Sequence, residues 1–491
     1  MVKRSKPHIP KLEKEITALS LFISKHRKYV LLAYFLSFVV FVMLQFHILL
    51  NWDMLVRILN ANYLFHNGFY FENQRALLES LLIGLFGFVF GGYAVYAYLV
   101  VAVLLFFIAI WQFSRSFGVD FLLLTFVLFN PFVIFYIAKN GSEVFLISFL
   151  MIFISFVKGK KYYAGIFLAL ALVSKYDALL FSPLLLFVLD RDVLKSLVRF
   201  VANIAVFFAA LIPFFLYNLI TYGNFIYTLA LAFEYIAVVG RPVSLNLLGF
   251  FELVVPAIIL MLIFFIKRKL EFNGSREDAL ILGSAAVLGI YPYYSANALF
   301  VGGLGAFRFF LLPLVFVLMG VAFFADKQHI LPLLLFSALS LMLAFFMLAN
   351  QPQAQAVPYD FALQVNSFRA VYNTTNCTVV SPDWVILDYF GLPAQPRPPT
   401  VYNGTPIVTL GPYWGSPYPL LSNASDVYIY GQSYCKFHKV VYNFLQNQPA
   451  NVLQQLHEAG PCSWLFNESL KIGPLFYSCN AINWALNRTF A

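Results

Sequence analysis

The feature that most constrains this chain is a series of long apolar runs separated by short polar segments. A helix needs about 20 apolar residues to cross the hydrocarbon core of a bilayer, and such runs recur between residues 29 and 349. Only 11% of the residues are charged, whereas about 25% are charged in an ordinary soluble domain. We therefore expect a polytopic membrane protein, which excludes a disordered chain, a coiled coil and an ordinary soluble enzyme.

The runs predict about eleven transmembrane helices in an all-α domain over residues 29–349. Two short runs, 162–174 and 178–189, could instead form a hairpin of half-helices that meet at Lys175, Tyr176 and Asp177. The predicted spans are 29–50, 93–112, 120–138, 144–157, 162–174, 178–189, 197–217, 244–266, 279–296, 309–325 and 330–349.

Basic residues are concentrated on one predicted side of the membrane. The arm at residues 1–28 and the alternate loops hold 20 Lys and Arg residues, and the opposite loops hold 6. Cytoplasmic loops carry the excess of Lys and Arg, so we expect a cytoplasmic N-terminus. The net charge of +10 is then explained by the orientation of the chain in the membrane. We therefore expect no nucleic-acid partner. The arm is too polar for a secretory signal peptide, so the first span should remain as an anchor.

An odd number of spans places the tail, residues 350–491, outside the cytoplasm. All the cysteines of the chain lie in this tail, and disulfides persist in oxidising compartments, so we expect two disulfides with three possible pairings. The cysteines are Cys377, Cys435, Cys462 and Cys479. Glycosylation sequons also collect there, at Asn373, Asn376, Asn403, Asn423, Asn467 and Asn487.

The tail has the pattern of a small folded domain that follows a linker at 351–357. Runs at 377–381 and 426–430 are bounded by turn residues, which is typical of short strands. Segments 451–459 and 481–487 predict short helices. We therefore expect a small extracytoplasmic α/β domain.

A carboxylate follows the first span directly, at the start of a long outer loop over residues 51–92. The apolar spacing after Asp53 predicts a helix lying on the membrane surface. Asp53 and Arg57 are four residues apart, so they could simply pair on one helical face. The alternative is that Asp53 is a general base beside the membrane, where a lipid-linked substrate would be reached.

Other ionisable residues lie at the same predicted outer side, where such groups tend to be functional. Glu143 could be a carboxylate that the dipole of the next helix favours, or it could bind a substrate. Lys175 could extend to the membrane interface or bind a phosphate. Arg308 could be an interface anchor, but the glycines at 302, 303 and 305 suggest a close approach to something bound. Arg241 joins this outer group.

Four stretches together form a recognisable series. They are Asn51-Trp52-Asp53; Asn130-Pro131 with Gly141-Ser142-Glu143; ALALVSKYDAL at 169–179; and Pro213–Asn218 with Tyr222-Gly223-Asn224 and Phe307-Arg308-Phe309…Leu312-Pro313. In order and predicted side they resemble the GT-C superfamily of integral-membrane glycosyltransferases, over about residues 30–325. Members that use dolichyl-phosphate mannose and members similar to aminoarabinose transferases are the nearest in pattern.

The sequence also departs from that family. Many members have two adjacent acidic residues in the first outer loop, whereas Met54 follows Asp53 here. A divalent cation is therefore possible but lacks an acidic pair, and we expect no metal site and no cofactor. Phe309 stands where Tyr is common. The oligosaccharyltransferase signature WWDYG is absent, which disfavours transfer of a preassembled glycan.

The resemblance implies a membrane enzyme that moves one sugar from a polyprenyl phosphate or dolichyl phosphate to a hydroxyl of a glycan, lipid or protein, with inversion. Asp53 would be the base, and Lys175, Arg308 and Arg241 would bind the leaving phosphate. Glu143, Tyr176 and Asn218 would contact substrate. A prokaryotic plasma membrane is favoured over the endoplasmic reticulum. The alternatives are a transporter or flippase of a lipid-linked sugar, and an anchored adhesin or assembly protein.

Overall fold

The structure of the chain is a computed structural model. It describes residues 19–49, 51–66, 68, 70–190, 192–232, 255–262, 272–300, 307–326, 329–350, 379–381, 384–391, 394–395, 407–410, 420–424, 427–430 and 440–442. Side chains in 291–309, and those from residue 395 onward, lie outside the description.

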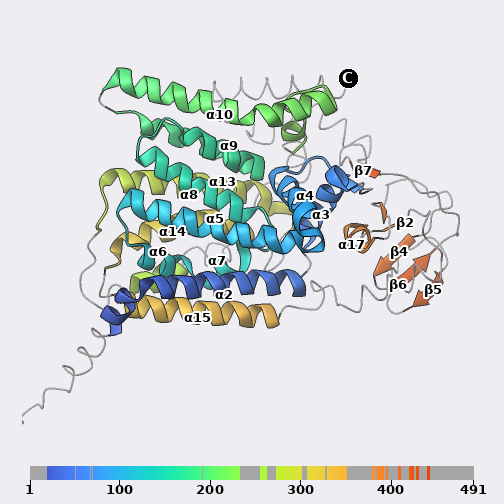
Figure 1. Cartoon of the computed structure of the whole chain (residues 1–491), viewed down its shortest axis with the longest axis horizontal. Helices are drawn as coiled ribbons and strands as arrows, with labels where there is room; N and C mark the ends of the chain where they lie inside the picture. The colour runs from blue at the N-terminus through green and yellow to red at the C-terminus, as the bar shows by residue number, and fades with distance from the viewer. Residues whose placement is uncertain are drawn as a thin grey trace, which may run out of the picture.

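The described residues form mostly helices, which lie side by side in a bundle (Figure 1). The bundle helices before the long α10 are α2 (Arg27–Ile48), α5 (Ala94–Phe117), α6 (Phe121–Leu128), α7 (Pro131–Tyr136), α8 (Glu143–Lys158), α9 (Ala164–Ser174) and η2 (Tyr176–Val188). They are followed by α10 (Val193–Tyr222), α13 (Arg276–Phe300), α14 (Phe307–Val321), η4 (Ala322–Phe324) and α15 (Ile330–Ala349).

Within the described ranges, 4 segments are long and apolar enough to cross a membrane. They are Arg27–Ile48, Leu78–Phe117, Val193–Tyr222 and Ile330–Ala349. Ala164–Ser174, Tyr176–Val188 and Phe310–Phe324 are apolar but shorter. The chain therefore has the helices of a membrane protein, and the count of about eleven spans stays a prediction.

The predicted span 120–138 is divided into two short helices for a local reason. Asn130 accepts hydrogen bonds from the backbone N–H groups of Phe132 and Val133, each at 3.1 Å, and thereby caps α7. Pro131 takes the first position of α7, where a missing N–H costs no helical hydrogen bond. Hydropathy alone does not register such a break, because both halves are apolar.

The segment predicted to be the first outer loop folds as a helical hairpin at one end of the bundle (Figure 1). It contains α3 (Trp52–Phe65), β1 (Tyr70–Glu72), α4 (Leu78–Phe90) and η1 (Gly91–Tyr93). The helix predicted after Asp53 is present, but α3 is not a surface helix, since every residue from Met54 to Ala61 is buried. Helix α4 covers it: a Cβ at Gly84 would meet the Phe65 ring at 2.0 Å.

The tail contributes short strands beyond this end of the bundle. One sheet has the order β3-β2-β4-β6-β5, with β2–β3 and β2–β4 parallel and the other pairs antiparallel. Its strands are β2 (Val379–Val380), β3 (Ala394–Gln395), β4 (Ile407–Leu410), β5 (Leu420–Ala424) and β6 (Val427–Tyr430). Helix α17 (Trp384–Tyr389) follows β2, and β7 (Val440–Tyr442) pairs with β1.

Strands therefore occupy part of both segments predicted to be strands, 377–381 and 426–430. The four cysteines and the predicted helices 451–459 and 481–487 lie outside the described residues, as do all the sequons except Asn423 in β5. The α/β tail domain and its disulfides stay predictions.

Candidate functional site

Ionisable side chains from six segments meet at the end of the bundle that α3 and α4 cover. We call this group the outer cluster, after its predicted side of the membrane. Its most exposed ion pair is Lys175–Asp177, and the Asp53–Arg75 pair is partly exposed. The members are Asp53 and Arg57 on α3, Glu72 on β1, Arg75 in the following turn, Glu79 on α4, Glu143 on α8, and Lys175 and Asp177 at the junction of α9 and η2.

Two carboxylates bracket one guanidinium in the outer cluster. Arg75 Nη1 donates to Asp53 Oδ1 at 2.6 Å, and Arg75 Nε donates to Glu72 Oε2 at 2.6 Å. The side chains of Asp53 and Arg75 are 13% and 26% exposed, so solvent and a substrate can reach this bridge. The predicted pairing of Asp53 with Arg57 takes another form: Arg57 Nη1 donates to the backbone oxygen of Asp53 at 2.9 Å.

Hydrogen bonds from asparagine side chains to the backbone hold both ends of the Asp53–Arg75–Glu72 bridge. The side chain of Asn51 accepts from the backbone N–H of Asp53 at 3.0 Å and caps α3. On the other side, Asn60 in α3 donates to the backbone oxygen of Glu72 at 3.0 Å and accepts from its N–H at 2.8 Å. The strand that carries Glu72 is thereby fixed to the helix that carries Asp53.

A second pair, Arg57 and Glu79, lies deeper in the protein. Arg57 Nε is 3.9 Å from Glu79 Oε2, and the Glu79 side chain is 0% exposed. Among the described residues, neither carboxylate oxygen of Glu79 has a hydrogen-bond partner. Gly141 lets the Arg57 stem approach, because a Cβ there would lie 3.3 Å from Arg57 Cδ and 2.8 Å from Met54 Sδ.

Glu143 and Lys175, predicted separately from the sequence, are neighbours in the structure. Lys175 Nζ lies 3.4 Å from Glu143 Oε1 and 3.4 Å from Asp177 Oδ2. Asn140 and Ser142 donate to the two carboxylate oxygens of Glu143, at 3.4 and 3.3 Å. Glu143 is also the first residue of α8, where the helix dipole favours a carboxylate. Lys175 therefore has acidic neighbours that balance its charge.

Tyr176 and Asn218 also lie together, linked through Thr228. The Tyr176 hydroxyl donates to Thr228 Oγ1 at 3.1 Å and reaches the backbone oxygen of Arg75 at 3.5 Å. Asn218 accepts from the backbone N–H of Thr228 at 2.9 Å and donates to the backbone oxygen of Phe214 at 2.9 Å. Asn218 is fully buried, so its amide holds the chain together at the position where the sequence suggested substrate contact.

Two predicted phosphate ligands remain outside this description. Arg241 lies in the range 233–254, outside the described residues. Arg308 is the second residue of α14, and its side chain is not among those described. Within the outer cluster, five carboxylates accompany three cations, so a bound phosphate would need further positive charge.

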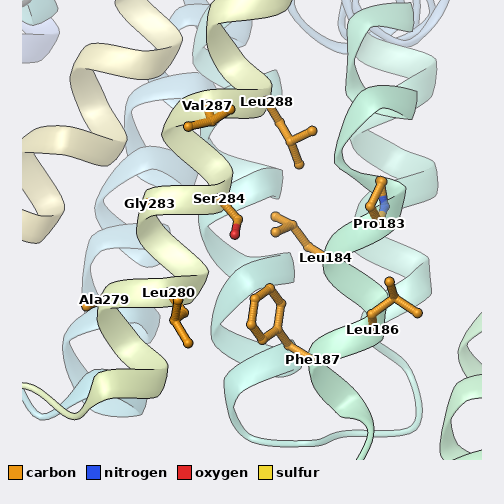
Figure 2. A pocket seen from close by; sticks show the side chains of 10 residues that line it. All are labelled: Pro183, Leu184, Leu186, Phe187, Ala279, Leu280, Gly283, Ser284, Val287 and Leu288. Atoms are coloured by element: carbon orange, nitrogen blue, oxygen red, sulfur yellow. The ribbon is translucent and has the colours of Figure 1, made fainter.

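An apolar groove runs between η2 and α13 (Figure 2). Its volume is about 660 Å³, and Ser284 supplies the one side-chain oxygen among its lining residues. Figure 2 shows Leu184 and Phe187 of η2 pointing toward Leu288 and Leu280 of α13. A 3₁₀ helix rises about 2 Å per residue, so Pro183–Phe187 lie about 14–22 Å along η2 from Tyr176.

The described residues contain no group of three His, Cys, Asp or Glu side chains that could hold a metal ion. Asp53 and Glu72 instead share Arg75, and an oriented, partly exposed carboxylate of this kind can accept a proton from a substrate hydroxyl.

Comparison of the chain with protein-family models, curated proteins and solved structures finds no match. The resemblance to the GT-C superfamily therefore rests on the four sequence stretches alone.

Sequence reasoning missed Glu72, Arg75 and Glu79, which all lie in the first outer loop. Glu79 does carry a signal, because it is a lone carboxylate at the start of the apolar run 80–90. Charged residues in such runs are costly in a membrane and tend to be functional. Arg75 and Glu72 have no comparable signal, because their partners come from the folded hairpin.

Proposed function

We propose that this protein is a membrane glycosyltransferase that moves a sugar from a polyprenyl phosphate to a hydroxyl acceptor at the outer end of the bundle. The observation that carries the proposal is that three of the resembling stretches, which hold Asp53, Glu143 and Lys175, lie at one end of the bundle. A transporter more often has its ionisable groups at the membrane midplane, and the outer cluster lies at a helix end.

Asp53 is the proposed general base. It would take the proton of the acceptor hydroxyl while the oxygen attacks the anomeric carbon from the face opposite the phosphate, which inverts that carbon. Arg75 holds the Asp53 carboxylate in one orientation, and base catalysis of this kind contributes about 10²- to 10⁴-fold to the rate. The proton that leaves the acceptor ends on Asp53, and the bonding electrons of the C–O bond leave with the phosphate.

The donor phosphate is proposed to lie near Lys175, with Arg241 and Arg308 as further ligands. Fixed cations stabilise the negative charge that develops on a leaving phosphate. Since Glu143 and Asp177 balance Lys175, the two arginines have to supply the excess positive charge. The hydrocarbon chain of the donor would continue along η2 into the groove of Figure 2, because residues of η2 line that groove.

The proposal places the outer cluster and the tail outside the cytoplasm of a prokaryotic plasma membrane. The acceptor is then a glycan, lipid or protein on that side, and no cofactor is required because the sugar arrives already activated.

Incubation of the purified protein with a panel of polyprenyl-phosphate sugars and acceptors tests the proposal, with mass spectrometry of the released polyprenyl phosphate. Release that requires an acceptor is expected for at least one donor. Movement of a labelled donor across a vesicle bilayer without any release would instead identify a flippase.

A further inference from the structure

One aromatic side chain of the tail contacts both the segment that carries the candidate base and the strand that carries Glu72. The ring centroid of Trp384 in α17 lies 5.1 Å from that of Trp52, edge to face, and 4.4 Å from that of Tyr70. Trp384 is buried in this contact. Trp52 directly precedes Asp53, and Tyr70 stands two residues before Glu72. One ring therefore contacts the segments that carry the two carboxylates of the bridge.

A second contact between the tail and the outer loop is made through the backbone. Strand β7 pairs in parallel with β1, with Tyr70 opposite Val440 and Glu72 opposite Tyr442. This contact is separate in sequence from Trp384, yet it fixes the same strand. The tail thus holds β1 through a ring contact at its start and through hydrogen bonding along its length.

We propose that the tail is a structural part of the candidate site, with Trp384 as a positioning residue that sets the geometry of the Asp53–Arg75–Glu72 bridge. The effect of Trp384 on catalysis rests on the proposed function. The effect of Trp384 on the structure of the bridge does not. Arg75 can hold both carboxylates only while the start of α3 and the end of β1 keep their spacing. A rigid ring in contact with both Trp52 and Tyr70 helps to maintain that spacing, together with the hydrogen bonds between Asn60 and Glu72.

The structural half of the proposal needs no substrate to be tested. We expect Trp384→Ala in the full chain to raise amide hydrogen exchange in 51–57 and 70–76 by about tenfold, which corresponds to roughly 1.4 kcal/mol of opening free energy. Trp384→Phe should restore most of the protection. Tyr389→Ala is the matched control, because it also removes a ring from α17. The described ring contact of Tyr389 is with Phe390. Unchanged exchange in 51–57 and 70–76 would overturn the proposal.

The functional half uses turnover with whichever polyprenyl-phosphate sugar is active. Trp384→Ala should lower kcat by about tenfold with donor KM changed less than about twofold, because the bridge acts on the acceptor proton. Phenylalanine should rescue kcat. Equal losses for Trp384→Ala and for Tyr389→Ala would show a general packing effect and would contradict a positioning role.

A variant in the second contact keeps the test decisive if Trp384→Ala does not fold. Val441→Pro removes a backbone N–H from β7 opposite Phe71. Increased exchange in 70–76 with an intact bundle supports the coupling, and no increase contradicts it. If no donor is turned over, the exchange result still decides whether the tail holds the bridge, so failure of the proposed function remains distinguishable.

Discussion

Asp53 is the proposed general base, and its replacement is the sharpest single test of the proposed function. Asp53→Asn keeps the shape and removes the basicity, so turnover should fall by about 10²- to 10⁴-fold. Expression and donor binding should stay close to those of the wild type. The measurement is release of polyprenyl phosphate together with a binding isotherm for the donor.

Asp177→Asn is the matched control for that substitution. Asp177 is also a partly exposed carboxylate with a basic neighbour, but that neighbour is Lys175, at 3.4 Å, whereas the neighbour of Asp53 is Arg75. Its loss should change donor binding more than kcat. Near-normal transfer by Asp53→Asn would refute Asp53 as the base and would make Glu143 the next candidate.

Asp388 gives a pH-dependent prediction outside the bundle. Burial raises the pKa of this carboxyl well above its usual range, and the hydrogen bond from the Ala394 N–H at 2.6 Å offsets this only in part. A raised folded pKa means that the folded tail binds the proton more tightly than the unfolded tail does. The contribution of Asp388 to the stability of the tail is therefore complete below its unfolded-state pKa of about 3.9. It is lost as the pH rises through the folded-state pKa.

Asp388→Asn should therefore weaken the dependence of tail stability on pH. It should also make α17 more stable at neutral pH, by on the order of 1 kcal/mol. Hydrogen exchange of residues 384–391 at pH 4.5 and at pH 7.5 provides the measurement. A wild-type segment that is better protected at pH 7.5 than at pH 4.5 would contradict the prediction.

For single residues, the sequence predicts groups whose position relative to a span is informative. Asp53, Glu143 and Lys175 each stand at the end of an apolar run, so all three were identifiable and meet in the outer cluster. Arg75 was not identifiable, because its importance comes from Asp53, which is 22 residues away in sequence and adjacent only after α3 and β1 pack.

Helices α9 and α10 approach each other closely enough that a substitution between them should separate them. A Cβ at Gly165 would lie 2.1 Å from the backbone oxygen of Asn203, and the Gly165 N–H donates to Asn203 Oδ1 at 2.9 Å. Gly165→Ala must push the helices apart, which we expect to cost about 1–3 kcal/mol. Thermal unfolding in detergent should show the loss as a lower Tm.

Gly320→Ala is the control for that experiment. Gly320 is also within a helix, α14, but no described heavy atom lies within 4 Å of its ideal Cβ position. Alanine there should be neutral or should stabilise by up to about 0.5–1 kcal/mol, since glycine is unfavourable inside a helix. Equal effects of the two substitutions would contradict the close contact of α9 with α10.

The elements illustrate what hydropathy can and cannot predict. The helix after Asp53 was predicted from its apolar spacing, but its burial was not, because α4 covers it. The glycines that allow this, Gly84 and Gly87, have no distinctive pattern in an apolar run. The contact partner of a helix depends on the fold around it, whereas its existence depends largely on local sequence.

The two ends of the bundle carry separate ionic groups. Helix α8 joins them, with Glu143 at the outer cluster and Lys158 at the other end, about 22 Å away along the helix. Lys158 there pairs with Asp278 at 2.6 Å, and Lys160 pairs with Asp190 at 2.9 Å. Lys158 and Lys160, which are predicted to be cytoplasmic, thus also link α8 and the turn after it to neighbouring segments.

The sequence predicted the membrane character of the molecule and the end at which its polar residues collect. Helix lengths were less accessible, because the run 120–138 is broken at Asn130-Pro131, and α9 and η2 are each shorter than a bilayer requires. The contact of the tail with α3 was beyond sequence reasoning, since it depends on rings more than 300 residues apart.

The position of the tail is linked to the orientation of the whole chain in the membrane. The tail contacts the outer loop through Trp384 and β7, so it must lie on the same side of the membrane as Asp53. If that side is outside the cytoplasm, Cys377, Cys435, Cys462 and Cys479 are exposed to an oxidising compartment. Mass mapping under non-reducing conditions should then find two disulfides and no free thiol. Four free thiols in protein from its native membrane would contradict the outer placement of the tail and, with it, the outward-facing site.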